Sequence, residues 1–396
     1  MSSEYSLSTR ETRRLNRSRV LSALRFQALA GRAEVAAFTG LTEAAVSRIT
    51  RELIDAGVLT EESPPASGGR SVGRPLIKLS LVGGAAHVLA FEIAASAQSV
   101  SLIDMRGDRI GHAELSLLDG LKPDVALRRA ADAGLKLIER TGISPGTVVG
   151  AGVSIAGAVD PDSGHVLSAP NIGWSSVPVA GPLAKRLRMP VRVESRASAL
   201  LLAEHRLGVA KHARNVLLIN LALGIGGAII MDGRLVRGRN HAAGQIGHMP
   251  MPGATGLCMC TRTGCLDTLA SGRAILSRLD RLSTHSDLTR HGASDAQTLR
   301  AVVHEADQGD IPTMQVLRDA GQHLGTALQW SGATLQPDLI VIAGEPSRSV
   351  AYLEGVRASY SDPQAAPIAV SRIANEVAAA ELALDAFVYT KGLDIG

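Results

Sequence analysis

Cysteine and long apolar runs are both scarce in this 396-residue sequence. All three cysteines fall within residues 258–265, which argues against the disulfide framework of a small secreted domain. No apolar run approaches the roughly 18 residues that a membrane helix requires, and the polar N-terminus lacks the apolar core of a signal peptide. We therefore expect a cytoplasmic globular protein that does not bind membranes and contains two or three domains.

Excess positive charge is confined to the N-terminal fifth of the sequence. Residues 1–80 contain 12 Lys/Arg and 8 Asp/Glu, whereas the rest of the chain contains 29 of each. This distribution favours a nucleic-acid-binding module attached to a neutral body. A net charge of +4 is also common on ordinary solvated surfaces, so the charge alone does not decide the matter.

Three consecutive N-terminal segments have helical apolar spacing: 17–29, 32–41 and 41–59. In the third segment, Val46, Ile49 and Leu53 share one face. Thr42 is a candidate N-cap, and Gly57 can end the helix. The second and third helices, joined by a turn that contains glycine, predict a helix-turn-helix.

Two short strands, 58–62 and 75–81, are predicted to flank a Gly/Pro/Ser loop and to complete a winged helix over residues 1–80. Short outward side chains let the third helix approach base edges, while arginines on the helix and in the loop reach phosphates, guanine or the minor groove. The alternative is an ordinary helical domain with solvated arginines. The candidate DNA-binding residues are Thr42, Glu43, Ala44, Ser47, Arg48, Arg51, Arg70 and Arg74.

The remaining residues predict two α/β lobes with a cleft between them, because strand hairpins followed by helices occur twice. Strand hairpins are predicted at 87–110 and 215–236, further buried strands at 147–160, 190–195 and 336–344, and helices at 197–208, 271–282, 313–335 and 374–388.

Six segments occur in the order and spacing of the ROK family, which this chain resembles over residues 85–390: 150–174, 190–204, 224–230, 242–248, 258–267 and 336–344. That family groups bacterial transcriptional repressors with sugar kinases of the actin-like ATPase fold, and the N-terminal region resembles its repressor branch. The resemblance implies an α/β protein: an N-terminal winged helix-turn-helix followed by a two-lobed actin-like (ribonuclease H-like) fold. The expected boundaries are 1–80 for the DNA-binding domain, 81–195 with 374–396 for lobe 1, and 196–373 for lobe 2.

The segment 248–265 offers one imidazole and three thiols, from His248, Cys258, Cys260 and Cys265. A closed Cys₃His set is a structural zinc site. Buried unpaired cysteines or a Cys-x-Cys redox pair are the alternatives from spacing alone. The zinc loop of the family matches at all four ligands, so the resemblance implies structural Zn²⁺. Thr261 departs from the family, which usually has glycine there.

The phosphoryl-transfer machinery of the family's kinases is altered. The resemblance places Arg196 where those kinases have the aspartate base, and a guanidinium has no acceptor. The first phosphate loop is Glu92–Ser96, with alanines in place of glycines, and the later loops are altered at 222–223 and 343–345. We therefore expect no kinase activity. Asp160 is interpreted as a turn residue and Glu194 as a structural partner of its strand end.

The family's sugar contacts, carried over position by position, include Ser195, Arg196, Gln245, His248 and Asp267. One hypothesis is an anionic sugar derivative held by Arg196. A second is that sugar binding is lost, and a third is that Arg196 pairs with Glu194 or Asp267 and fills the cleft. Asn171 and Trp174 are interpreted as loop-fixing more than ligand-stacking. The full set of candidate ligand-binding residues is Gly157, Asn171, Ser195, Arg196, Gln245, His248 and Asp267.

The sequence thus predicts a DNA-binding transcriptional regulator, a repressor of carbohydrate uptake or catabolism genes. Its expected partners are a double-stranded operator, a sugar or sugar-derived effector, and a second copy of the chain in a homodimer or tetramer. The rival functions are an active sugar kinase with a DNA-binding appendage and an architectural DNA-binding protein that senses nothing.

Overall fold

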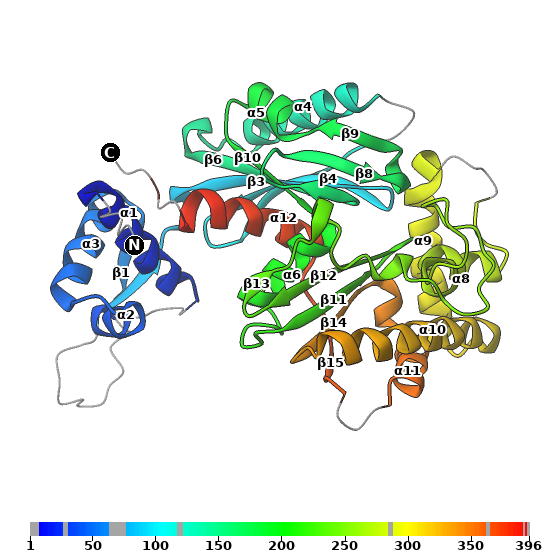
Figure 1. The fold of residues 1–396 in the computed structure, drawn as a ribbon. Coiled ribbons are helices and arrows are strands. Elements are labelled where there is room, and N and C mark those ends of the chain that lie inside the picture. Colours follow the sequence, from blue (N-terminus) through cyan, green and yellow to red (C-terminus); the bar gives the residue numbers. More distant parts are fainter. Residues whose placement is uncertain are drawn as a thin grey trace.

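The computed structural model describes residues 8–26, 31–62, 77–116, 122–283, 288–361, 365–390 and 393. Figure 1 shows the N-terminal helices at one end of the molecule. Two five-stranded sheets, a smaller three-stranded sheet and their covering helices make up the rest. Among the described helices, none combines the length and apolar character needed to cross a bilayer.

The N-terminal helices form where the sequence predicts them: α1 (Thr9–Phe26), α2 (Arg32–Thr39) and α3 (Glu43–Asp55). The Thr42 side chain accepts a hydrogen bond from the Ala45 amide at 3.2 Å, which confirms the predicted N-cap. Gly57 has a φ of 70°, and the Val58 amide donates to the Leu53 carbonyl at 2.8 Å. This is a Schellman ending, which requires a left-handed residue and so explains the glycine.

The antiparallel strands β1 (Leu59–Glu62) and β2 (Lys78–Leu81) follow α3 and pair with each other, as predicted from the sequence. The predicted wing arginines, Arg70 and Arg74, lie outside the described residues.

The first sheet has the strand order β10-β6-β3-β4-β5, and we refer to the part built on it as lobe 1. Helices α4 and α5 pack on this sheet, and the small sheet β7-β8-β9 adds Trp174 to the same core. The strands are β3 (His87–Ala94), β4 (Ala97–Asp104), β5 (Arg109–Glu114), β6 (Val148–Ile155), β7 (Ala158–Asp160), β8 (His165–Ala169), β9 (Trp174–Pro178) and β10 (Val191–Ser195), and the helices are α4 (Pro123–Thr141) and α5 (Ala180–Leu187).

The second sheet has the strand order β13-β12-β11-β14-β15 and defines lobe 2. Its strands are β11 (Val216–Leu221), β12 (Ile225–Met231), β13 (Arg234–Leu235), β14 (Leu339–Gly344) and β15 (Ile368–Val370). Its helices are α7 (Asp267–Ala270), α8 (Gly272–Arg278), α9 (Leu288–Asp307), α10 (Ile311–Leu335) and α11 (Val350–Ser359).

Helices α6 (Arg196–Leu207) and α12 (Asn375–Ala383) lie between the two sheets and contact each other (Figure 1). A Cβ at Gly152 of β6 would lie 2.0 Å from the Ala379 carbonyl oxygen, so glycine is needed where α12 crosses the sheet. The predicted closing helix 374–388 changes geometry after Ala383, because Leu384–Tyr389 forms a π-helical turn.

The N-terminal helices share one apolar core with the C-terminal segment and lobe 1. Leu21 and Leu24 of α1 belong to the same buried cluster as Leu384 and Val388 near the C-terminus and Met105 after β4. Packing therefore continues across the boundary predicted at residue 80. The boundaries themselves remain a prediction.

Candidate functional site

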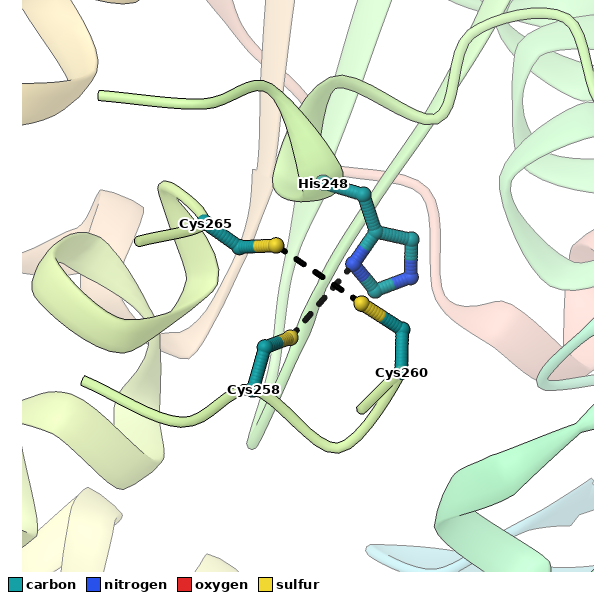
Figure 2. A group of neighbouring side chains, drawn as sticks. All are labelled: His248, Cys258, Cys260 and Cys265. Atoms are coloured by element: carbon teal, nitrogen blue, oxygen red, sulfur yellow. Dashed lines mark hydrogen bonds between the residues drawn. The ribbon is translucent and has the colours of Figure 1, made fainter. Parts of the chain in front are cut away.

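The four residues predicted to bind metal converge on one point, as Figure 2 shows. One ring nitrogen of His248 and the Sγ atoms of Cys258, Cys260 and Cys265 all lie within 4.8 Å of one another. The Cys258 sulfur lies 3.6 Å from His248 Nδ1, and the Cys260 sulfur lies 3.6 Å from that of Cys265. A tetrahedron with metal–ligand distances of about 2.0–2.3 Å has edges of about 3.5–3.8 Å. These four residues, here called the metal cluster, therefore fit one metal ion.

Close backbone packing positions His248. It ends the short 3₁₀ helix η5 (Ile246–His248), which lies against β12. A Cβ at Gly247 would lie 2.3 Å from the Ile225 carbonyl oxygen, so only glycine allows this approach.

The cysteine loop folds back on itself. The Cys258 amide donates to the Arg262 carbonyl at 2.8 Å, and the Gly264 amide donates to the Gly256 carbonyl at 2.9 Å. Thr261 lies at the turn with a φ of 68°, a conformation that glycine adopts more readily. The departure noted in the sequence therefore affects the turn and leaves the four ligands in place.

Charge around the metal cluster suits a divalent cation. Burial raises the pKa of Cys258 to about 12. Burial also raises the pKa of Cys260, but hydrogen bonds with Arg262, Cys258 and Cys265 together outweigh burial and lower that pKa to about 7. Three thiolates around one divalent ion leave a single negative charge, which the neighbouring guanidinium balances.

A cavity of about 330 Å³ lies beside the metal cluster, between the two lobes, and we refer to it as the cleft. All seven residues predicted to contact a ligand line it, but that they bind one remains a prediction. Sequence reasoning missed Ser96, Asn220, His241 and Arg262, which also line the cleft. Asn220 and His241 belong to no recognisable motif. Ser96 and Arg262 lie within the phosphate loop and the zinc loop, but those motifs were interpreted through other residues.

Arg196 forms a buried ion pair across the first sheet. Its Nη2 lies 2.9 Å from Glu92 Oε1, and its Nη1 donates to Ser96 Oγ at 3.1 Å. The side chains of Arg196 and Glu92 are only 13% and 9% exposed. The hypothesis that Arg196 pairs with Glu194 or Asp267 is wrong. Parallel strands β3 and β10 flank β6, so their ends meet at one edge and bring Glu92 close to Arg196.

The other carboxylates have structural partners. Glu194 Oε2 accepts a hydrogen bond from Arg237 at 2.7 Å, which agrees with its interpretation as a structural residue. Asp267 accepts from the Ile225 amide at 2.6 Å, and burial raises the pKa of Asp267 to about 6. Asp160 accepts from the Asp162 amide at 3.0 Å, the pattern of a turn.

The arginine at position 196 has a clear chemical consequence. It borders both the cleft and a second, more polar cavity of about 380 Å³ on the side of Gly344 and Glu345. A guanidinium remains protonated and donates only, so it cannot take a proton from a sugar hydroxyl. Arg196 therefore cannot act as a general base at this point in the cleft.

Helix α3 presents the predicted DNA-binding residues to solvent. Thr42, Glu43, Ala44, Arg48 and Arg51 are exposed, while Ser47 is half-buried. Val46, Ile49 and Leu53 are buried on the opposite face. The amphipathic arrangement predicted from the sequence is confirmed for α3.

A second ion cluster, which contains the buried pair Arg25–Glu381, connects α1 to the rest of the chain. Arg25 pairs with Glu381 of α12 through Nη1 and Nη2 of its guanidinium, whose central carbon lies 4.3 Å from the ring centre of Tyr389. Arg206, near the end of α6, lies 3.5 Å from Glu381 and 2.7 Å from Asp385. We refer to Arg25, Glu381, Arg206 and Asp385 as the joint cluster. It ties three segments together: α1, α6 and the C-terminal helix.

The family model described as "ROK family" matches residues 129–384. The chain belongs to the ROK family. Its fold class is the one predicted from the sequence, and a crystal structure of a ROK family transcriptional regulator, described as a homolog of the E. coli MLC protein, superposes with a TM-score of 0.75. That match covers 96% of this chain and 98% of the other at 22% identity, and it concerns the fold alone.

Curated ROK proteins of two kinds resemble this chain. The xylose repressor of Caldicellulosiruptor bescii is 24% identical over 85% of this chain and 84% of its own length. The dual regulator NagC of Escherichia coli K12 is 28% identical over 79% and 76%. A glucokinase of Halalkalibacterium halodurans is 32% identical over 55% of this chain and 68% of its own length. The two transcriptional regulators thus match over more of this chain than the kinase does.

Proposed function

We propose that this protein is a sugar-responsive transcriptional repressor that binds an operator through its N-terminal helices and a sugar in the cleft, without phosphorylating that sugar. The observation that carries the proposal is the Arg196–Glu92 pair, which puts a permanent cation at the position that the family resemblance assigns to the base. The relatives named as a xylose repressor and as a DNA-binding transcriptional dual regulator match along most of the chain and support the DNA-binding part.

Helix α3 is the proposed recognition helix of a winged helix-turn-helix. Ala44 and Ser47 are small enough to let the helix approach base edges, while Arg48 and Arg51 reach guanine or phosphate. The chain acts as a homodimer or a tetramer in this proposal, because a repeated operator matches two recognition helices about one DNA turn apart.

The metal cluster is proposed to hold structural Zn²⁺. Three thiolates and one imidazole close the tetrahedron and leave no open position for catalysis. The bound ion would fix the segment 248–265, which forms one wall of the cleft. His248, Cys260 and Arg262 belong to this segment and line the cavity.

A neutral sugar suits the cleft better than an anionic one at position 196. Glu92 already neutralises Arg196 within the protein, so an anionic group would have to compete with a buried carboxylate. Hydroxyl and amide side chains that line the cleft, including Asn171, Asn220 and Gln245, match sugar hydroxyls without adding charge.

Helix α6 offers a route from the cleft to the DNA-binding part. It begins at Arg196, which borders the cleft, and it carries Arg206, which contacts Glu381 of the joint cluster. Arg25 of α1 pairs with the same carboxylate. We propose that a shift of α6 on sugar binding changes the setting of the N-terminal helices and thereby the operator affinity.

Genome-wide footprinting identifies the operator, and gel shifts on that operator with and without sugars then test the function. Arg48→Ala is expected to weaken operator binding by about 1–3 kcal/mol, whereas Arg128→Ala, in an exposed ion pair of α4, leaves binding unchanged. The absence of any sequence-specific site would contradict the DNA-binding part. Operator affinity indifferent to every sugar would instead favour an architectural protein.

A further inference from the structure

Two consecutive residues beside the cleft have an unusual backbone. Asn240 and His241 have φ values of 61° and 53°, the left-handed region that glycine occupies most easily. Both belong to the 3₁₀ segment η4 (Arg239–His241) of lobe 2. Asparagine and histidine tolerate this region better than most residues, but glycine would be less strained there. Such strain persists where the surrounding structure holds it, often at binding sites.

The strained segment and Arg237, two residues before it, each contact lobe 1. Arg237 donates to Glu194, a carboxylate whose side chain is only 2% exposed, at 2.7 Å. Four residues later, His241 Nε2 lies 3.5 Å from Asp160 Oδ1 on β7. His241 also lines the cleft. The strained segment therefore places the His241 imidazole beside the cavity, at the boundary between the two lobes.

The other ring nitrogen lacks a partner within the described part of the chain. His241 Nδ1 is buried and makes no hydrogen bond there. A hydrogen bond from the Ser163 hydroxyl lowers the pKa of Asp160, so this carboxylate is ionised and only accepts. A neutral ring beside it carries its proton on Nε2, which makes Nδ1 a hydrogen-bond acceptor.

We propose that His241 Nδ1 accepts a hydrogen bond from a hydroxyl or amide N–H of the sugar in the cleft, and that Asp160 orients the ring for this contact. The inference rests on the proposed function and adds a ligand-binding residue to it. A ligand donor at this point satisfies a buried acceptor that the protein otherwise leaves unpaired. The same contact discriminates against a sugar that lacks the donor, because the acceptor then stays unpaired.

The backbone strain provides a test that separates binding from folding. His241→Gly removes the ring and relieves the strain, so the melting temperature is expected to rise while sugar affinity falls at least tenfold. Asn240→Gly is the matched control, since it relieves the same kind of strain beside the ring. It is expected to raise the melting temperature and leave affinity unchanged. His241→Asn keeps an acceptor on a residue that tolerates a left-handed backbone, and it is expected to retain affinity within about threefold of the parent.

Calorimetry of the full chain against D-xylose, D-glucose and N-acetyl-D-glucosamine measures these affinities, and gel shifts on the operator measure DNA binding separately. Unchanged affinity in His241→Gly would overturn the inference, as would an equal loss in Asn240→Gly. If the parent binds none of these sugars, the inference is also wrong. Operator binding then shows whether the DNA-binding part of the proposed function still holds.

Discussion

The Arg196–Glu92 pair and the joint cluster lie near opposite ends of α6, and both contain a buried arginine and glutamate. At the cleft end, the pair borders two cavities and retains 13% and 9% exposure. At the joint end, Arg25 and Glu381 are only 6% and 1% exposed, and the same carboxylate also faces Arg206. The cleft pair is therefore within reach of a ligand, whereas the Arg25–Glu381 pair of the joint cluster is enclosed by protein.

This difference suggests different tasks for the same interaction. A buried ion pair adds little net stability, but its geometry restricts how two segments can be oriented. At the joint, that restriction holds α1 against the C-terminal helix. At the cleft, it replaces a proton acceptor with a fixed cation and leaves space in which a sugar can be recognised.

The largest expected effect comes from removing a metal ligand at the cleft end. Cys265→Ser is expected to abolish bound zinc and to lower the melting temperature by about 10 °C or more, because structural zinc contributes several kcal/mol. Thr261→Gly, in the same loop, is the control and should keep both metal and stability. Metal analysis and thermal unfolding check this, and a Cys265→Ser protein that still holds one zinc per chain would refute the site.

Breaking the joint cluster is expected to have the next largest effect. Arg25→Met leaves Glu381 buried with only Arg206 near it. This change is expected to lower the free energy of unfolding by about 3 kcal/mol and to weaken operator binding. Arg128→Met removes an exposed pair with Asp124 and should cost less than about 0.5 kcal/mol. Urea unfolding compares the two variants. Equal losses of unfolding free energy in the two variants would mean that Arg25 and Glu381 do not form the buried pair described above.

At the cleft end, Arg196→Met is expected to lower the free energy of unfolding by about 2 kcal/mol. This loss is smaller than that of Arg25→Met, because Glu92 is more exposed than Glu381. The double variant that also carries Glu92→Met removes the stranded carboxylate and should recover most of this loss. A double-mutant cycle in urea measures the coupling. Additive losses would show that the two side chains do not interact.

The smallest expected change in stability, with a specific change in response, comes from Arg206→Met. In the parent protein, sugar is expected to change operator affinity by about 5–150-fold. If α6 connects the cleft to the joint cluster, this sugar-dependent change should largely disappear in the variant. Sugar binding and sugar-free operator binding should persist. Arg214→Met, which removes an exposed pair with Asp232, is the control. A full response in the Arg206 variant would rule out this route.

Local chemistry made much of the fold predictable. The cap at Thr42, the ending at Gly57 and the strand hairpin over 215–236 each depend on a few neighbouring residues, and each forms as predicted. The metal cluster was also predictable, because its spacing and the family resemblance agree and the structure brings its four members together.

The remaining features depend on contacts between distant segments. Arg196 and Glu92 meet only because β6 lies between their strands in the sheet, an order that no local pattern reveals. His241 belongs to a loop without a motif, and its strained φ is visible only in three dimensions. The π-helical turn after Ala383 likewise interrupts an apolar pattern that predicts an unbroken helix.

The most direct test of recognition without transfer is phosphorus NMR of the purified protein with MgATP and D-xylose, D-glucose or N-acetyl-D-glucosamine. The Arg196–Glu92 pair predicts that no sugar phosphate forms beyond the level seen without protein. Sugar-dependent formation of a phosphate ester, lost when Arg196 is replaced by methionine, would contradict the account.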